Sequence, residues 1–447
     1  MSSKLDGSWR WKLSPENLMK LFRWTAVTCL ALCGATAFAE NWPEWRGPRH
    51  NGISTETGIA TSWAKDKNVA WRVKLPGQGG ATPVVWDDRL YLTSAEGDDL
   101  VVIGISTSGK ELWKTKIGSG NKDARTGEGN SASPSPVTDG QHVWVFFGTG
   151  ELACLDTAGK IVWQFNVAER YGKIDIQFGM TSTPILHDGS LYLQLIHGPG
   201  SKDNSVGKVV SLVAATGQEN WAIDRNQKPE DECQHAYASP ILMPGKHPHL
   251  ITHGGDCTVG IALADGKELW RLDELNGPSQ YNKNHDNTLR FVASPAATAE
   301  FLVVPTAKGG PVLGLQASEL SGNVTGKSPV KWVGDRTPDV SCPVIHEGLV
   351  YLCMVDGRLR CVDQQTGEKV YDERVHNAAY RASGVVSEGH MYLTARDGVC
   401  TVVKLGKAFE VLAENELFGE PQTASPVISN GTLYMRTYET LYAIRSK

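Results

Sequence analysis

The sequence predicts an all-β protein: an eight-bladed β-propeller built from four-stranded antiparallel blades. Three observations carry this prediction. A short phrase recurs eight times, each recurrence holds about four short apolar runs, and one strand is left over at the N-terminal end. No segment shows a sustained helical period, so the pattern argues against a fold of alternating strands and helices.

The recurring phrase is a small residue, a proline, a short apolar run, a turn and a hydrophobic pair. In the first copy Pro83 is followed seven and eight residues later by Leu90-Tyr91, and Pro184 is followed in the same way by Leu191-Tyr192. The copies follow one another at steps of 41 to 56 residues and begin at Pro83, Pro136, Pro184, Pro240, Pro295, Pro343, Gly384 and Pro426. Such a period, with this strand-like content, is typical of propeller blades.

Each unit then continues through a second alternating run to a turn and an aromatic residue. Ser108-Gly109-Lys110-Glu111-Leu112-Trp113 shows the pattern. The proline suits the start of a short innermost strand, where a missing N–H is tolerated. A large aromatic at the end of the unit is suited to pack between adjacent blades. The residues expected to dock in this way are Trp71, Trp113, Trp163, Trp221, Trp270, Trp332 and Tyr371.

The two ends of the repeat region complement each other. An extra strand around residues 68–73 precedes the first copy, whereas the last copy stops at Tyr442-Ala443-Ile444 without its outer strand. We therefore expect the N-terminal strand, with Trp71, to complete the last blade and close the ring. Closure removes the exposed edges that an open sheet would present.

The turn-and-tryptophan phrase [Ser/Ala/Thr]-Gly-Lys-Glu-x-Trp resembles the docking motif of the PQQ-like, or quinoprotein-type, β-propellers. This resemblance covers about residues 68 to 447, and Trp42-Pro43-Glu44-Trp45-Arg46-Gly47-Pro48 resembles the leader of bacterial exported members. It implies the propeller fold and two kinds of function. Some members are PQQ- and Ca²⁺-dependent dehydrogenases, and others bind no quinone and assemble the outer membrane.

The N-terminal region predicts export. Lys20 and Arg23 precede the apolar stretch 25–38, and Ala37-Phe38-Ala39 fits a cleavage site. Met19 makes a more ordinary signal start than Met1. The apolar run is shorter than the roughly 20 residues that span a membrane. We expect a signal peptide at 1–39, a leader at 40–67 and one propeller at 68–447, in a periplasmic or extracellular protein without a stable membrane span.

Net charge argues against a nucleic-acid partner, and cysteine positions indicate which disulfides could form. The formal net charge is −5 and the basic residues are scattered, so no nucleic-acid partner is expected. Of nine cysteines, Cys233 and Cys257 are the pair best suited to a disulfide, if one forms. A tight hairpin at Asp356-Gly357 would set Cys353 opposite Arg360 and Cys361 opposite Leu352, on opposite faces of the sheet.

No metal site is expected from the sequence. Although His247, His249 and His253 lie close together in the chain, we interpret them as surface turn residues rather than metal ligands.

Polar residues gather just before each copy of the phrase, in loops that should converge on one mouth of the channel. Arg290 and Arg381 are suited to binding an anion, and Asp339 is a weak candidate for a catalytic base. A small polar or anionic ligand is the expected partner of this ring. The candidate ligand-binding residues are Gln78, Asn130, Gln177, His235, Tyr237, Arg290, Asp339, Arg381 and Gln422.

The leading interpretation is therefore an exported cell-envelope propeller, most simply a monomer, that binds a ligand or another envelope protein rather than acting as an enzyme. The chain has no adjacent Cys-Cys pair and no Cys-x-x-Cys-His motif, so no cofactor is expected. One alternative is a dehydrogenase of alcohols or sugars that uses PQQ and Ca²⁺. Another is a protein–protein scaffold for envelope assembly that acts by strand addition.

Overall fold

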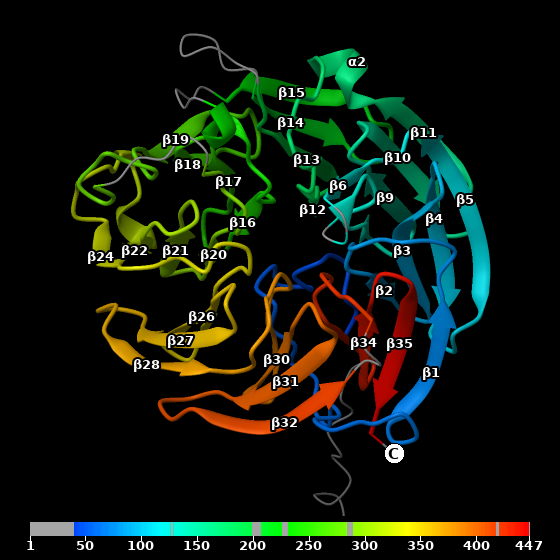
Figure 1. Ribbon diagram of the computed structural model, residues 1–447. Coiled ribbons are helices and arrows are strands. Elements are labelled where there is room, and N and C mark those ends of the chain that lie inside the picture. Colours follow the sequence, from blue (N-terminus) through cyan, green and yellow to red (C-terminus); the bar gives the residue numbers. More distant parts are fainter. Residues whose placement is uncertain are drawn as a thin grey trace, which may run out of the picture. The chain divides into compact units, whose positions relative to one another are not determined.

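The computed structural model describes residues 40–125, 127, 129–198, 207–225, 231–283, 289–416 and 420–446. The predicted signal peptide, residues 1–39, lies outside this range. The described chain forms eight four-stranded antiparallel blades arranged around a channel (Figure 1), and β23 (Gly322–Asn323) adds a strand to one of them. The predicted fold class is confirmed.

In blades 1 to 7 the strands are hydrogen-bonded in chain order, and in every blade the short strand that follows the proline (or Gly384) is innermost. Blades 1 to 4 consist of β2 (Val84–Trp86), β3 (Arg89–Glu96), β4 (Asp99–Ser106) and β5 (Glu111–Ser119); β8 (Val137–Thr138), β9 (His142–Phe146), β10 (Glu151–Asp156) and β11 (Ile161–Asn166); β12 (Ile185–His187), β13 (Ser190–Leu195), β14 (Lys208–Val213) and β15 (Glu219–Asp224); and β16 (Ile241–Met243), β17 (His249–Gly254), β18 (Cys257–Ile261) and β19 (Glu268–Leu272).

Blades 5 to 8 repeat this order and complete the ring. They consist of β20 (Ala296–Ala297), β21 (Phe301–Pro305), β22 (Val312–Gln316) and β24 (Val330–Gly334); β25 (Val344–His346), β26 (Leu349–Cys353), β27 (Arg358–Asp363) and β28 (Lys369–Arg374); β29 (Val385–Ser387), β30 (His390–Thr394), β31 (Val399–Lys404) and β32 (Glu410–Glu416); and β33 (Val427–Ser429), β34 (Thr432–Arg436), β35 (Thr440–Arg445) and β1 (Val69–Lys74).

The ring closes as the sequence predicts. Strand β1 pairs antiparallel with β35, and Trp71 lies opposite Ala443. In Figure 1 the blue β1 runs beside the red β35, so the two ends of the propeller share one sheet. The last blade would otherwise lack its outer strand and expose the edge of β35.

A few short elements depart from the repeat. Strand β23 (Gly322–Asn323), from an insertion in blade 5, adds a fifth, parallel strand to the outer edge of blade 4. The hairpin β6–β7 (Asp123–Arg125 and Gly129–Asn130) precedes blade 2. The helical segments among the described residues are α2 (Val167–Tyr171), η1 (Asp231–Gln234) and η2 (Ala317–Glu319).

The repeated tryptophans contact the next blade. The indole N–H of Trp113 donates to the Thr157 carbonyl 3.0 Å away, and the ring lies over Gly159, where an added Cβ would come within 2.4 Å of it. Within its own blade Trp113 packs on Tyr91, with 5.8 Å between ring centroids. The same inter-blade N–H bond links Trp71 to Thr107, Trp163 to Ala214, Trp221 to Leu263 and Trp332 to Gln364.

Two of the expected docking residues behave differently. Trp270 donates to His249 Nε2 of its own blade at 2.9 Å, because the insertion in blade 5 replaces the short glycine turn that would receive it. Tyr371 packs edge-on against Phe409 of the next blade. Among the described residues its hydroxyl has no hydrogen-bond partner.

The cysteine predictions need correction. The turn of the β26–β27 hairpin is longer than the two residues expected, because the Gly357 N–H closes on the Met354 carbonyl. Cys361 therefore lies opposite Tyr351, and Cys353 lies opposite Leu359. This one-residue shift puts the two thiols on the same face, although both remain unpaired.

Cys233 and Cys257 are also unpaired and buried. The Cys233 sulfur accepts a hydrogen bond from Asn276, and the Cys257 sulfur accepts one from Arg225 at 2.7 Å.

The histidine prediction was wrong in one respect. His253 is not a surface turn residue: it is fully buried in β17, and its Nδ1 lies 2.7 Å from the Thr258 hydroxyl. Burial, with Arg225 nearby, lowers its pKa to about 3. The histidines and other polar residues of this segment made it look like a turn, although it forms β17, the second strand of blade 4.

Candidate functional site

The leader lies at one end of the channel. Trp42 exchanges two 2.8 Å backbone hydrogen bonds with Val85, Arg46 donates to the Pro343 carbonyl, and Ser54 donates to the Val386 carbonyl. These contacts fall at or just after the start of the repeated phrase, whereas the candidate binding residues precede it. The leader therefore crosses the channel at the end opposite to those loops.

Above the leader the channel widens into a cavity of about 620 Å³. Residues from all eight blades line it, and so does Trp45 of the leader. Trp42 is fully buried, but Trp45 is only half-buried and lines the cavity. The second tryptophan of the leader is thus part of the cavity wall.

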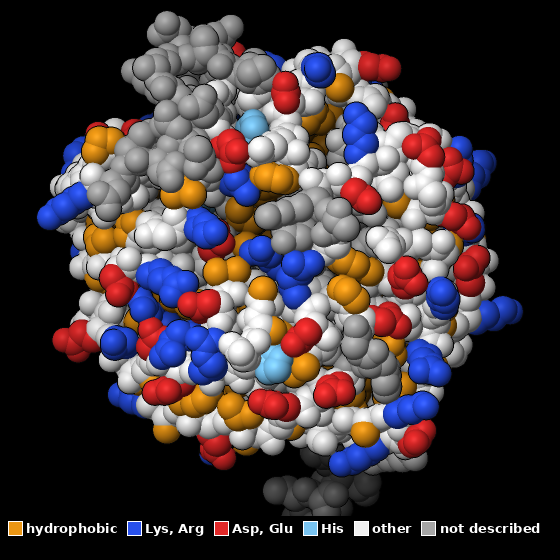
Figure 2. Space-filling model, viewed as in Figure 1, with side chains coloured by type: hydrophobic (Ala, Val, Ile, Leu, Met, Phe, Trp, Pro, Cys, Tyr) orange, Lys and Arg blue, Asp and Glu red, His pale blue; other side chains and the backbone are white. Residues whose placement is uncertain are grey.

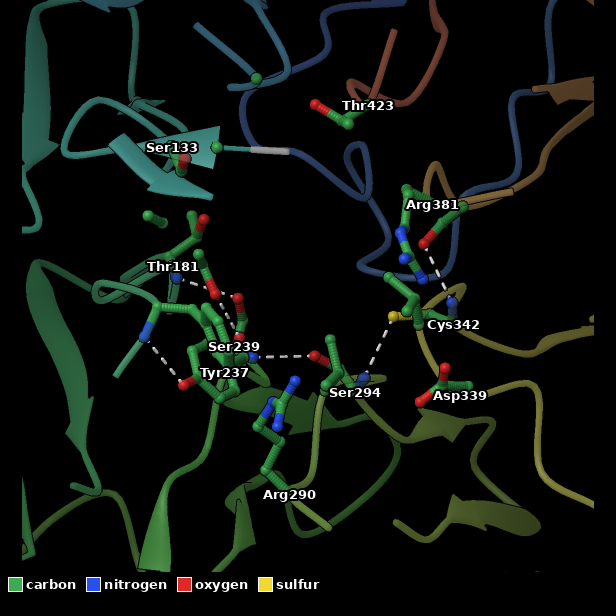
Figure 3. Close-up of a pocket in the computed structure, with 18 of the residues that line it drawn as sticks. Ser133, Thr181, Tyr237, Ser239, Arg290, Ser294, Asp339, Cys342, Arg381 and Thr423 are labelled. Carbon is green, nitrogen blue, oxygen red and sulfur yellow. Dashed lines mark hydrogen bonds between the residues drawn. The ribbon is translucent and has the colours of Figure 1, made fainter. Parts of the chain in front are cut away.

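The residue directly before each proline (or Gly384) forms a closed ring around this cavity, which we call the hydroxyl ring. In every blade the backbone N–H at this position donates to the side-chain oxygen or sulfur of the same position in the next blade, over 2.8 to 3.2 Å. Figure 3 shows the part from Ser239 through Ser294 to Cys342. The ring consists of Thr82, Ser135, Thr183, Ser239, Ser294, Cys342, Ser383 and Ser425.

Two residues earlier, a second tier of side chains lines the same cavity. Alternate residues of extended backbone share a face, so this tier follows from the first. Unlike the hydroxyl ring, it differs chemically from blade to blade and makes the wall asymmetric. Its members are Gly80, Ser133, Thr181, Tyr237, Val292, Val340, Arg381 and Thr423.

Arg290 is held on an aromatic shelf. Its guanidinium lies 4.3 Å from the centre of the Phe178 ring and 5.9 Å from that of Tyr237, and it forms an ion pair with Glu232. The Tyr237 hydroxyl accepts a hydrogen bond from the Phe178 N–H, and burial raises the pKa of Tyr237 to about 12. Stacking fixes the plane of the guanidinium while leaving its edge for polar contacts.

Asp339 lies between cations contributed by neighbouring loops. Its φ of +75° breaks the alternation of extended backbone, and its side chain lines the cavity. Burial raises the pKa of its carboxyl, and nearby Lys308, Arg381 and Arg290 oppose that rise. Lys308 also lines the cavity, so three cations and Asp339 share the sector of blades 5 to 7. Figure 2 shows basic side chains near the centre of this face.

Of the nine predicted ring residues, four line the cavity: Tyr237, Arg290, Asp339 and Arg381. Among the described lining residues, prediction from sequence missed Lys308, Trp45 and the hydroxyl ring. The signal for the ring was present, since the small residue of the phrase carries a hydroxyl in seven copies and a thiol in the eighth.

The other five do not line this cavity. Gln78 is exposed and donates to Glu439, and Gln177 is exposed. Asn130 is buried and its side-chain oxygen accepts from the Ala132 N–H. His235 lies against Gly198, and burial lowers its pKa. Gln422 is buried and donates to the Ala424 carbonyl.

The described residues contain no group of three or more His, Cys, Asp or Glu side chains that could hold a metal ion. No helix in this part of the chain is long and apolar enough to span a bilayer.

Comparison with known proteins gives a consistent family. The family model described as outer membrane protein assembly factor BamB matches residues 52–230, 204–407 and 259–447. A protein of that name from Burkholderia pseudomallei is 24% identical over 209 residues, which are 46% of each chain. This chain thus spans about half the length of that relative.

Solved structures share the fold at low identity. BamB from Moraxella catarrhalis is 13% identical with a TM-score of 0.59, over 85% of this chain and 97% of that one. Quinohemoprotein alcohol dehydrogenase ADHIIG from Pseudomonas putida HK5 is 14% identical with a TM-score of 0.64, over 91% and 80%. At these identities the likeness concerns the fold alone.

Proposed function

This chain belongs to the BamB-like family of PQQ-type propellers, and we propose that it is an exported cell-envelope protein that binds an anionic ligand in its channel. Export rests on the signal sequence read in residues 1–39 and on the envelope role that the name of the relative states. The ligand class rests on the cavity.

The observation that carries the proposal is the convergence of Arg290, Lys308 and Arg381 on one cavity. Charge-assisted hydrogen bonds from such groups favour carboxylate, phosphate and sulfate. The cavity volume of about 620 Å³ falls in the range of small-molecule sites. Asp339 reduces the positive field at this site when it is ionised, so the cavity favours an anion most when Asp339 is neutral.

The alternative of a PQQ-dependent dehydrogenase fits the described residues less well. Calcium requires several oxygen ligands, with carboxylates prominent. Of the two cavity carboxylates, Glu232 is paired with Arg290, and Asp339 is surrounded by cations. The described donor set therefore does not fit Ca²⁺, and we derive no reaction step through a quinone.

The test is a calorimetric titration of the purified processed protein with citrate, a tricarboxylate probe. Lys308→Gln and Arg381→Gln should each weaken binding by about tenfold, since each removes one charge-assisted contact. Lys110→Gln, at an exposed turn away from the cavity, is the matched control and should bind as wild type.

Two results would contradict the proposal. One is citrate affinity that is unchanged in both cavity variants. The other is a stoichiometric complex with PQQ and Ca²⁺ that reduces a dye in the presence of an alcohol, which would favour the dehydrogenase.

A scaffold role is the second candidate, and the edge of blade 4 favours it. There β23 already adds a parallel strand to β19. An outer blade edge of this protein can thus accept a strand, which is how a partner segment would dock. A partner complex that survives both Lys308→Gln and Arg381→Gln would support this role over binding in the channel.

A further inference from the structure

The hydroxyl ring has donors that the fold does not use. Each ring oxygen accepts the N–H of the neighbouring blade, which leaves its own O–H to donate. None of the seven hydroxyls donates to another described residue. The eight ring residues are only 2% to 6% exposed, yet all of them line the cavity.

A hydroxyl that lines a cavity donates either to water or to a bound acceptor, so a ligand that displaces the water must offer an acceptor in its place. Hydroxyls from seven of the eight blades surround one space, so a single acceptor group on the channel axis can receive hydrogen bonds from several of them. The cations of blades 5 to 7 lie beside the same space, as the second tier places Arg381 two residues before Ser383. This field favours an acceptor that carries negative charge.

We propose that the hydroxyl ring is a binding site for one oxyanion group, a carboxylate, sulfate or phosphate, held on the channel axis. The inference deepens the proposed binding function and rests on it. The cations Arg290, Lys308 and Arg381 attract the ligand, and the ring hydroxyls donate hydrogen bonds to its acidic group. The side chains of this ring are nearly the same in every blade, so the bound group should sit on the axis rather than against one blade.

Cys342 allows a test of this proposal, because it is the one thiol in a ring whose other seven members carry hydroxyls. Its Sγ accepts the Ser294 N–H at 3.2 Å, so a thiol maintains the ring while donating only weakly. Cys342→Ser completes the set of hydroxyls, and Ser294→Cys removes one more. Both variants preserve an acceptor for the neighbouring N–H and should therefore fold.

Sulfate, titrated by calorimetry at constant ionic strength, is the probe. We expect Cys342→Ser to tighten sulfate binding and Ser294→Cys to weaken it, each by roughly threefold, with unchanged Tm. Sulfate affinity that is equal in wild type and both ring variants, or no sulfate binding by wild type, would overturn the ring site. If Lys308→Gln alone weakens sulfate, the ring proposal fails while the proposed function at the mouth survives.

The start of the leader lies against a buried carboxylate, at a place separate from the cavity. The buried carboxylate of Glu56 accepts backbone N–H groups from Glu40 at 2.7 Å, Asn430 at 2.6 Å and Gly431 at 2.5 Å. Among the described residues no Lys, Arg or His forms an ion pair with it. The three N–H donors already stabilise the ionised carboxylate, and a cation in contact with it would stabilise it further.

Glu40 is fixed by its other polar atoms too. Its carbonyl accepts from the Ser429 hydroxyl at 2.7 Å, and its carboxylate pairs with Arg49 at 2.6 Å. Glu40 is also the residue that follows the predicted cleavage site Ala37-Phe38-Ala39.

From this we infer that processing supplies the missing cation. In hydrolysis of the Ala39–Glu40 bond, water gives a hydroxyl to the Ala39 carbonyl carbon and a proton to the Glu40 nitrogen. At neutral pH that nitrogen becomes an ammonium group already within hydrogen-bond distance of Glu56. Only in the processed protein would this ion pair hold the start of the leader to Glu56, which the Asn430 and Gly431 N–H groups already bind to blade 8.

The test inserts one glycine after Ala39, so that processing leaves the ammonium one residue away and Glu40 keeps an amide N–H. With N-termini verified by intact mass, the insertion should lower Tm by about 2 °C or more. In a Glu56→Gln background the same insertion should have no further effect. Two results would overturn this inference. One is an insertion that leaves Tm unchanged when Glu56 is present, and the other is an insertion that lowers Tm equally with Glu56 and with Glu56→Gln.

Discussion

Asp339 shows how one backbone angle can determine which side chain faces a cavity. Gln422 and Tyr380 occupy the same position relative to the phrase in their own blades, and both are buried away from the channel. At Asp339 a φ of +75° puts the backbone in the left-handed region, and the carboxyl lines the cavity. Such a conformation is uncommon for a residue other than glycine and often marks a functional position.

The raised pKa of Asp339 predicts that anion binding depends on pH. The carboxyl is neutral below its raised pKa and ionised above it, so rising pH adds a negative charge beside the ligand. Sulfate keeps its charge over this range. Its affinity should fall by roughly tenfold between about pH 4 and about pH 7. The measurement is a series of calorimetric titrations across this range.

Asp339→Asn is the control for this prediction. It should bind sulfate with nearly the same affinity throughout and should be no less stable at neutral pH, since ionised Asp339 is itself disfavoured by burial. A variant that keeps the full pH dependence would assign that dependence to another group.

At the scale of elements, the blades are held together by a glycine turn on one blade and a tryptophan on its neighbour. Trp113 of blade 1 lies over Gly159 of blade 2, and its N–H reaches the Thr157 carbonyl. Glycine is required at position 159 for two reasons. Its φ of +83° is strained for other residues, and the Trp113 indole fills the space that a side chain would occupy.

Gly159→Ala should separate these two requirements when compared with Gly189→Ala. Gly189 has a φ of +73° but no atom within 4 Å of an added Cβ, so its substitution costs only backbone strain, about 1–2 kcal/mol. At Gly159 the added Cβ would lie 2.4 Å from Trp113, which should cost a further 1–3 kcal/mol, approximately. Urea denaturation measures both; equal losses would mean that the indole moves aside freely.

Trp270 is an exception to the pairing of a tryptophan with the glycine turn of the next blade. Its sequence context matches that of the other docking tryptophans, yet its N–H remains within blade 4 and reaches His249. The insertion that carries β23 occupies the place of the short turn in blade 5. The docking motif therefore specifies the tryptophan, whereas its partner depends on the turn of the next blade.

At the scale of the whole molecule, two features turn eight repeats into one site. Strand β1 closes the ring through β35, and the leader crosses the channel from Val85 of blade 1 to Val386 of blade 7. Closure fixes the hydroxyl ring as a circle, since its last bond runs from Ser425 back to Thr82. The leader adds Trp45 to the wall at the opposite end from the loops.

Amino-acid order alone determined the parts of this protein that repeat. The proline phrase, the Gly-Lys-x-x-Trp turn and the missing last strand sufficed for eight blades and for closure by β1, because strand period and turn chemistry are local properties. It also placed Arg290 and Arg381 in loops that converge. The predictions of blades and turns hold because each strand and turn depends on neighbours a few residues apart.

Only the tertiary structure decided which loop residues reach the channel. The sequence patterns around five other loop residues favour binding as much as those around Tyr237 or Arg381, yet these five contact other loop residues or face solvent and do not line the cavity. They are Gln78, Asn130, Gln177, His235 and Gln422. Lys308, Trp45 and the circle of N–H to hydroxyl bonds arise from segments far apart in the chain. The positions of Lys308 and Trp45 depend on loop dihedrals and on the packing of the leader, which no local pattern encodes. The phrase supplies the hydroxyls of the circle, but the bonds between them form only when the blades close into a ring.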